Sequence, residues 1–176
     1  MKKNLRFAVA SFWILALLFA AFPVLAETNK TVVTGTVSFL GEPYEVPDNR
    51  TWETGGLNSY IFHWRNDYLE FRIVTNDPRL NGVQKSILDG EYFANKSGVF
   101  MHIWGKGTIY TGMGFTIPAW ECSSNEILDL IAGTGSVKVV CQGIGDNQGL
   151  VTKFTLVQIS DTDYQLEGVI IEPDSE

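Results

Sequence analysis

From residue 31 onward, apolar and polar residues alternate along short stretches of the chain, and this period of two predicts β-strands. Residues 31–39 show it most clearly, since valine, glycine and phenylalanine share one face while threonine and serine share the other. The same pattern predicts strands over residues 59–65, 68–74, 83–88, 109–117, 137–142, 150–159 and 164–171, and a further strand is expected over the apolar residues 99–104. About eight or nine antiparallel strands in one small domain predict an all-β fold, a single barrel of about eight strands, with a β-sandwich as the alternative.

Turn-forming residues divide these runs. Residues 66–67, Asn-Asp, predict a two-residue hairpin, and residues 105–107, Gly-Lys-Gly, predict a turn between two strands. Gly112 and Gly114 lie within the next run, where glycine is typical of a bend that lets a sheet curl into a barrel. We therefore expect short strands joined by tight turns.

Three other stretches carry specific expectations. Residues 99–104 (VFMHIW) are apolar on both faces, which predicts a strand covered on both sides, as in a barrel with a filled or ligand-bearing interior. Residues 41–58 are rich in residues that break regular structure, and they predict a long loop. Residues 123–131 begin with a capping-box pattern and predict one or two helical turns, with a short strand as the alternative.

The first 26 residues have the organisation of an export signal. Lys2, Lys3 and Arg6 precede an apolar run over residues 7–26 that ends in the small residue Ala26. We expect residues 1–26 to be a signal peptide, a hydrophobic helix removed on export, and residues 27–176 to be a single β-barrel domain. The alternative is a membrane anchor formed by residues 7–26, because the run is nearly long enough to span a bilayer.

Charge and cysteine content narrow the class of protein further. Without the signal segment, ten basic residues stand against 20 acidic ones, a net charge of −10, and this disfavours a nucleic-acid partner. Cys122 and Cys141 are the only cysteines, and an even number in an exported chain predicts a disulfide. We therefore expect a secreted or extracytoplasmic protein, which would meet the membrane only through residues 1–26 if these are not removed.

Three glycine-containing motifs occur along the chain, at residues 76–82 (NDPRLNG), 105–112 (GKGTIYTG) and 133–135 (GTG). In this order they resemble a group of exported bacterial β-domains without an assigned activity, whose barrels look like those of allene oxide cyclases and dirigent proteins. The resemblance implies a barrel over residues 33–171. It carries over no catalytic residue, because no active-site motif of either enzyme family matches these positions.

Few residues are available for acid–base or metal chemistry. His63 and His102 are the only histidines, and the chain contains no metal-ligand, phosphate-binding or cofactor motif, so we expect neither a metal nor a cofactor. The two histidines would indicate a metal or acid–base site only if strand pairing placed them side by side with a carboxylate between them.

Aromatic residues give the strongest indication of function. We expect Trp64, Trp104 and Tyr110 to line one barrel mouth, with His102 on the same buried strand as Trp104. Aromatic side chains of this kind line pockets for small molecules. The sequence therefore favours an exported, non-catalytic barrel that binds a small apolar or aromatic ligand, or a partner at the cell envelope.

Two other functions remain open. A cyclase or isomerase would hold a reactive substrate in the barrel, and Tyr68, Glu70 and Arg72 are its candidate residues if their face points inward. A structural surface domain without a pocket is the third possibility. The distinction depends on whether the barrel interior is open and on which residues face it.

Overall fold

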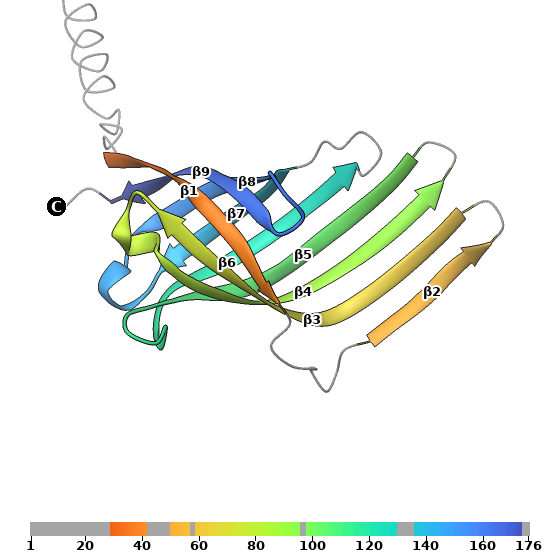
Figure 1. Ribbon diagram of the computed structural model, residues 1–176, viewed down its shortest axis with the longest axis horizontal. Coiled ribbons are helices and arrows are strands. Elements are labelled where there is room, and N and C mark those ends of the chain that lie inside the picture. The colour runs from red at the N-terminus through yellow and green to blue at the C-terminus, as the bar shows by residue number, and fades with distance from the viewer. Residues whose placement is uncertain (1–28, 42–49, 57–58, 96–97, 130–135, 174–176) are drawn as a thin grey trace, which may run out of the picture. The chain divides into compact units, whose positions relative to one another are not determined.

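The computed structural model describes residues 29–41, 50–56, 59–95, 98–129 and 136–173 of the chain. They form nine β-strands and two short 3-10 helices (Figure 1). The strands are β1 (Asn29–Gly41), β2 (Arg50–Gly56), β3 (Ser59–Thr75), β4 (Gly82–Asn95), β5 (Gly98–Thr111), β6 (Ile117–Asp129), β7 (Ser136–Gly143), β8 (Val151–Gln158) and β9 (Asp163–Glu172), and the helices are η1 (Pro78–Leu80) and η2 (Gly145–Asn147). The predicted signal segment, residues 1–26, lies outside the described residues. No helix within the described ranges has the length and apolar character needed to cross a membrane.

Eight strands close into an antiparallel barrel. They follow the order β1-β9-β8-β7-β6-β5-β4-β3, and β3 returns to pair with β1. The ninth strand, β2, pairs with β3 and lies outside this closed ring. The prediction of an all-β fold with a barrel of about eight strands is therefore confirmed, and the sandwich alternative is wrong.

One flank of the barrel is much longer than the rest. β1 pairs with only the second half of β3, and β6 pairs with β7 only over residues 120–124. Beyond these points β3, β4, β5 and β6 continue together with β2 as an open five-stranded sheet (Figure 1). We call this sheet the extension; it comprises residues 50–56, 59–65, 89–95, 98–104 and 125–129. Its inner face continues the inner wall of the barrel, and its outer face continues the outer wall.

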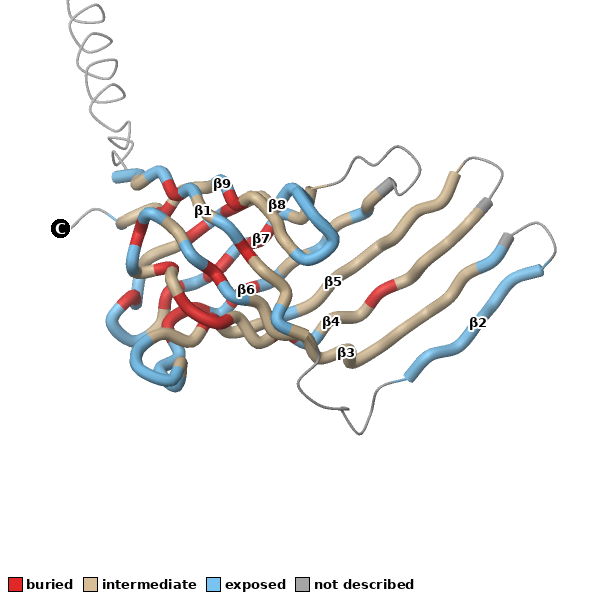
Figure 2. Tube along the Cα trace, viewed as in Figure 1, coloured by how far each residue is buried: buried red, intermediate tan, exposed pale blue. Residues whose placement is uncertain are grey.

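The end of the barrel opposite the extension holds the packed core. Buried positions gather there, whereas most of the extension is half-buried and β2 is exposed throughout (Figure 2). The largest fully buried side chains are those of Trp120, Ile73, Leu80, Ile109, Leu166 and Ile170. Except for Leu80, which lies on η1, these residues occupy inward-facing positions of strands, as the period-two pattern requires.

The segment 76–82, whose proline and glycine are typical of a turn, contains η1 and closes this end of the barrel. Asp77 caps η1 by accepting a hydrogen bond from the backbone N–H of Arg79 at 3.0 Å. Leu80 projects into the core, and the indole N–H of Trp120 donates to the carbonyl of Arg79 at 2.7 Å. Residues 76–82 are one of the three motifs on which the resemblance rests. They cover the end of the barrel opposite the extension, which we call the barrel base.

Two predicted turns are wrong, because both lie inside strands. Residues 66–67 form a bulge in β3, where Asn66 adopts a φ of 58° and the pairing with β4 shifts between Trp64 and Asp67. Residues 105–107 lie in the middle of β5. Glycine is needed at position 107 for close approach, since a Cβ there would overlap the Ser86 hydroxyl and lie 2.9 Å from the carbonyl of Lys85.

Three further expectations also change. Gly112 and Gly114 occupy the turn between β5 and β6, with φ values of 75° and 73°, and do not bend a strand. The helical turns expected over residues 123–131 are wrong, because β6 runs on to Asp129 and pairs with β5; the strand alternative is correct. The loop expected over residues 41–58 contains β2.

The disulfide prediction is confirmed. Cys122 on β6 and Cys141 on β7 are directly opposed partners in the sheet and are bonded through their sulfur atoms. Both cysteines are buried in the core. A structural disulfide of this kind indicates an oxidising, extracytoplasmic environment.

Candidate functional site

A cavity of about 520 Å³ lies inside the barrel, between the packed core and the extension. This volume falls within the range typical of small-molecule sites. Most of the lining is apolar and comes from all eight strands of the closed barrel: Val37, Phe39, Leu69, Phe71, Leu88, Met101, Ile103, Leu128, Val137, Val139, Leu156, Val157 and Tyr164. The polar lining residues are Gln84, Ser86, Ser124, Gln158 and Asp161.

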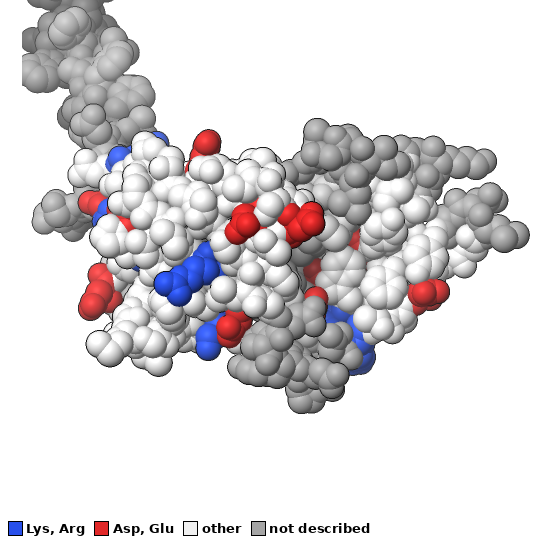
Figure 3. Space-filling view, viewed as in Figure 1, with Lys and Arg blue, Asp and Glu red and all other residues white. Residues whose placement is uncertain are grey.

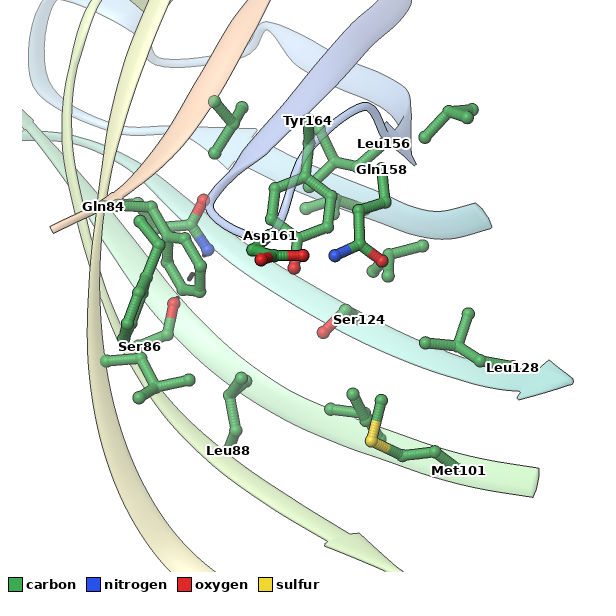
Figure 4. A pocket seen from close by; sticks show the side chains of 18 residues that line it. Gln84, Ser86, Leu88, Met101, Ser124, Leu128, Leu156, Gln158, Asp161 and Tyr164 are labelled. Carbon is green, nitrogen blue, oxygen red and sulfur yellow. Dashed lines mark hydrogen bonds between the residues drawn. The ribbon is translucent and has the colours of Figure 1, made fainter. Parts of the chain in front are cut away.

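The polar groups of the cavity form two sets (Figure 4). On β4, the side-chain amide of Gln84 donates to the hydroxyl of Ser86 at 2.8 Å, so these two residues satisfy each other. At the β8–β9 hairpin, the side chains of Gln158, Asp161 and Tyr164 gather at one side of the cavity (Figure 4). These groups supply the hydrogen-bonding positions that would orient a ligand in an otherwise apolar site.

Asp161 is the only ionisable acid or base in the described lining of the cavity apart from the phenol of Tyr164. Burial raises the pKa of Tyr164, so its hydroxyl stays protonated and uncharged in neutral solution. Neither a lysine nor an arginine of the described residues lines the cavity. The site therefore carries one negative charge and no compensating positive one.

The β8–β9 hairpin that carries these groups is held against β1. The Ser38 hydroxyl donates to the carboxylate of Asp163 at 2.6 Å, and the backbone N–H of Phe39 donates to the carbonyl of Thr162 at 2.8 Å. Hydrogen bonds from Ser38 and Ser160 lower the pKa of Asp163, which keeps it ionised as an acceptor. These hydrogen bonds hold the β8–β9 hairpin, which forms one side of the cavity rim, against β1.

The residues proposed for an enzyme lie on the outer wall of the barrel. Leu69 and Phe71 point into the cavity, so the alternating residues Tyr68, Glu70 and Arg72 point away from it. There the carboxylate of Glu70 lies 3.6 Å from the Lys85 ammonium, and the Arg72 guanidinium lies 4.7 Å from the ring centre of Phe115. The inward orientation that the enzyme alternative required is not observed.

The aromatic residues expected at one barrel mouth do not come together. Trp64 lies on the inner face, where its strand partner is Gly90, whereas Trp104 pairs with Asp89 and therefore lies on the outer face. The partners Gly90 and Asp89 are adjacent residues of β4. Because successive residues of a strand point to opposite faces, the two tryptophans do so as well. Tyr110 is also on the outer wall, with the Lys85 ammonium 5.4 Å from its ring centre.

On the outer face of the extension, Trp104 belongs to a set of aromatic and charged residues that we call the outer cluster: Trp52, His63, Arg65, Glu91, His102, Trp104 and Asn125. The Arg65 guanidinium lies between two indole rings, 5.2 Å from the centre of Trp52 and 4.6 Å from that of Trp104. It also donates to the Glu91 carboxylate at 3.2 Å. Such cation–π contacts fasten β2, which carries Trp52, to the rest of the sheet.

The two histidines do flank a carboxylate, since Glu91 is the direct strand partner of both His63 and His102. The ring nitrogens of His63 are already engaged, Nδ1 with Glu91 at 3.1 Å and Nε2 with the Thr54 hydroxyl at 2.7 Å. His102 Nε2 lies 2.8 Å from the side-chain oxygen of Asn125. Burial raises the pKa of Glu91, but hydrogen bonds from Arg65 and His63 outweigh it, and the net pKa is lowered. Among the described residues no group of three potential ligands could hold a metal ion.

The sequence did not reveal the cavity residues on β7 and β8, such as Val137, Val139 and Leu156. Their alternation predicted inward-facing positions, but it could not distinguish a packed interior from an open one. Asp161 lies in the turn between β8 and β9, where aspartate is common for backbone reasons, and only the folded structure places this exposed side chain at the edge of the cavity (Figure 4).

We compared the chain with protein-family models, with curated proteins and with solved structures, and none of them matches it.

Proposed function

We propose that the protein binds a small, predominantly apolar molecule inside its barrel. The observation that carries the proposal is the cavity of about 520 Å³ with its apolar lining and few polar groups. Burial of apolar ligand surface against this lining would supply most of the affinity, at roughly 25 cal/mol per Å² before the costs of association. The polar groups at the β8–β9 hairpin would determine orientation.

This proposal replaces the expected aromatic mouth with a different set of residues. Trp64 keeps a place beside the cavity on the inner face, whereas His102, Trp104 and Tyr110 are removed from it. The resemblance to the barrels of allene oxide cyclases and dirigent proteins supports a barrel built around a small molecule. An enzymatic role would need other residues than Tyr68, Glu70 and Arg72.

Binding can be tested with an uncharged hydrophobic reporter dye whose fluorescence rises in apolar surroundings. Val137→Trp would fill part of the cavity, because Val137 lines it. Val140→Trp is the matched control, since Val140 lies on the same strand, points outward and is 39% exposed. We expect Val137→Trp to weaken dye binding at least tenfold and Val140→Trp to leave it unchanged, with thermal unfolding confirming that both variants fold. Absence of dye binding to the unmodified protein would show that the proposal is wrong.

We also propose that residues 1–26 direct export and are removed. The disulfide supports a compartment that is oxidising. Intact-mass measurement of the exported protein tests the cleavage: a mass that starts at Glu27 supports it, and a mass that retains the apolar run indicates a membrane anchor instead.

A further inference from the structure

We infer that the ligand is an elongated, positively charged amphiphile, with its charged group beside Asp161 and its hydrocarbon chain on the inner face of the extension. The inference rests on the proposed function, since the cavity must first be a binding site. Three features carry it: the continuity of the cavity wall with the extension, the apolar character of that inner face, and the unpaired carboxylate of Asp161.

The cavity wall continues onto the extension without interruption. Met101 and Leu128 line the cavity and are direct partners on β5 and β6. Tyr92 is the partner of Met101 on the next strand, and Phe62 is the partner of Tyr92. These four side chains form one row across the inner face, so a chain that leaves the cavity meets Tyr92 and Phe62 next.

The inner face offers this row as a long apolar surface. Along β4, the span from Ser86 in the cavity to Tyr92 is about 20 Å at roughly 3.3 Å per residue. Phe62 and Trp64 lie side by side on the same face, with ring centres 6.3 Å apart, and each is half-buried. On the face of the extension visible in Figure 3, most side chains are uncharged. An aromatic surface that continues a cavity and that no other described element covers is suited to an extended hydrocarbon chain.

Charge selects the kind of amphiphile. The Asp161 carboxylate makes no hydrogen bond or ion pair with another described residue, and no described basic residue lines the cavity. On the inner face of the extension, Glu126 is paired with the Lys138 ammonium at 3.7 Å, whereas Glu53 lies on the exposed strand β2, outside the cavity lining, and accepts a hydrogen bond from the Tyr60 hydroxyl at 2.8 Å. A cationic group is therefore attracted to Asp161 and an anionic one is repelled. The aromatic ring of Tyr164 beside it would further favour an ammonium group.

The test uses alkyltrimethylammonium ions from octyl to tetradecyl, each kept below its micelle-forming concentration, with binding to the purified protein measured by calorimetry. We expect affinity to rise by about two- to fourfold for each added methylene across the whole series. Dodecyl sulfate, which has an anionic group, should bind at least tenfold more weakly than the dodecyl cation. The same measurements on variants then locate the head and the tail.

For the tail, Tyr92→Ala should flatten the gain from octyl to tetradecyl while leaving octyl binding unchanged. Phe93→Ala is the matched control, because Phe93 is the next residue on β4 and faces outward, where it stacks on Phe100. For the head, Asp161→Asn should weaken binding of the cation by roughly two- to fivefold, and the exposed Asp146→Asn should not. Phe62→Ala provides a second tail variant if Tyr92→Ala does not fold.

The outcomes separate this inference from the proposed function. If the octyl ion binds but longer chains gain nothing, or if Phe93→Ala acts like Tyr92→Ala, the cavity is a binding site and the extended chain is wrong. Preference for the sulfate would overturn the charge assignment. If no chain binds and the reporter dye fails as well, the proposed function is wrong too. Sedimentation tests whether a second copy of the chain covers the inner face. A dimer that dissociates on Tyr92→Ala would show that it does and would overturn the inference.

Discussion

The indole ring of Trp64 occupies the space over Gly90 on the neighbouring strand, so a Cβ atom on Gly90 would overlap the Cζ2 and Cε2 atoms of the ring. Gly90 is buried for this reason, although its neighbours on β4 are half-buried. Ile103, the partner of Gly90 on β5, lines the cavity. The pair therefore places an indole beside the point where the extension leaves the barrel.

Gly90→Ala should displace this ring, because the added methyl group has no free space. We expect the free energy of unfolding to fall by about 1–3 kcal/mol, the usual cost of an overpacked site. Urea unfolding measures the loss, and a shifted tryptophan emission spectrum reports the moved ring. Gly56→Ala on β2 is the control, since a Cβ there meets no atom within 4 Å. Equal losses in the two variants would contradict the packing explanation.

The ion pair at the barrel base makes a second prediction. The Asp77 carboxylate accepts hydrogen bonds from Arg79 at 2.7 Å from Nη2 and at 3.0 Å from Nε, and its side chain is buried. Asp77→Asn should lower the free energy of unfolding by about 1–3 kcal/mol, because it removes a buried charged acceptor from Arg79, whose own side chain is 33% exposed. Asp146→Asn, at an exposed position, should change it by less than about 0.5 kcal/mol. Urea midpoints compare the stability of the two variants. A similar small effect from both would show that the ion pair between Asp77 and Arg79 contributes little to stability.

The same ion pair predicts how stability depends on pH. The Arg79 guanidinium holds the pKa of Asp77 below its usual range, so the folded state binds fewer protons than the unfolded state in acid. The stabilisation is complete above the unfolded pKa, about 3.9, and is lost as pH falls through the lower folded value. Glu91 and Asp163 also have lowered pKa values, so urea midpoints should be measured between pH 6 and about pH 2.5 for the unmodified protein and for Asp77→Asn. The gap between the two curves should narrow in acid, and a constant gap would contradict the assignment.

Among the described strands only β3 pairs with β2, so we expect the contacts of Arg65 to help hold β2 in place. Arg65→Lys keeps the positive charge but loses the planar group that lies between Trp52 and Trp104. We expect the amide hydrogens of residues 50–56 to exchange several-fold faster with solvent, equivalent to about 1 kcal/mol of local stability. Exchange in β7 and β8 should be unchanged. Arg50→Lys, on an exposed residue of β2, is the control, and faster exchange there would show that any change at β2 has this effect.

The disulfide should make a large contribution to stability. Cys122 and Cys141 are 19 residues apart, and closing such a loop is worth about 3 kcal/mol in the chain-entropy model. Comparing oxidised with reduced protein avoids the cavity that an alanine substitution would leave in the core. We expect the urea midpoint of the reduced protein to fall accordingly, whereas coincident unfolding curves would mean that the bond constrains the unfolded chain very little.

Alternation along the chain was sufficient to predict the barrel and several of its strands, because β1, β7, β8 and β9 each place mainly apolar residues on their inner face. It failed where turn-forming residues serve a strand. Asn66 supports a bulge within β3, and Gly107 allows β4 and β5 to approach, so both resemble turns when only local composition is considered.

The site was harder to predict than the fold, because faces depend on the register between strands. Trp64 and Trp104 both follow apolar alternation, yet their partners on β4 differ by one residue and the two rings point to opposite faces. Asp161 illustrates a second limit. Its sequence context is that of a hairpin turn, and only the folding of that hairpin over the barrel brings its carboxylate to the cavity.

The pairing of β1 with β9 has a consequence for how the protein is made. Asn29, at the start of β1, lies opposite Glu172, at the end of β9. Of the described strands, the first synthesised therefore forms one of its two pairings with the last. Contacts between residues so far apart in the sequence form slowly, because a long loop must close before they contribute. During synthesis, which begins at the N-terminus, one edge of β1 therefore stays unpaired until β9 has been made. An unpaired strand edge is prone to aggregation. We therefore expect barrel closure to be a late event in folding, which leaves the edge of β1 open to contact with other chains until β9 has paired with it.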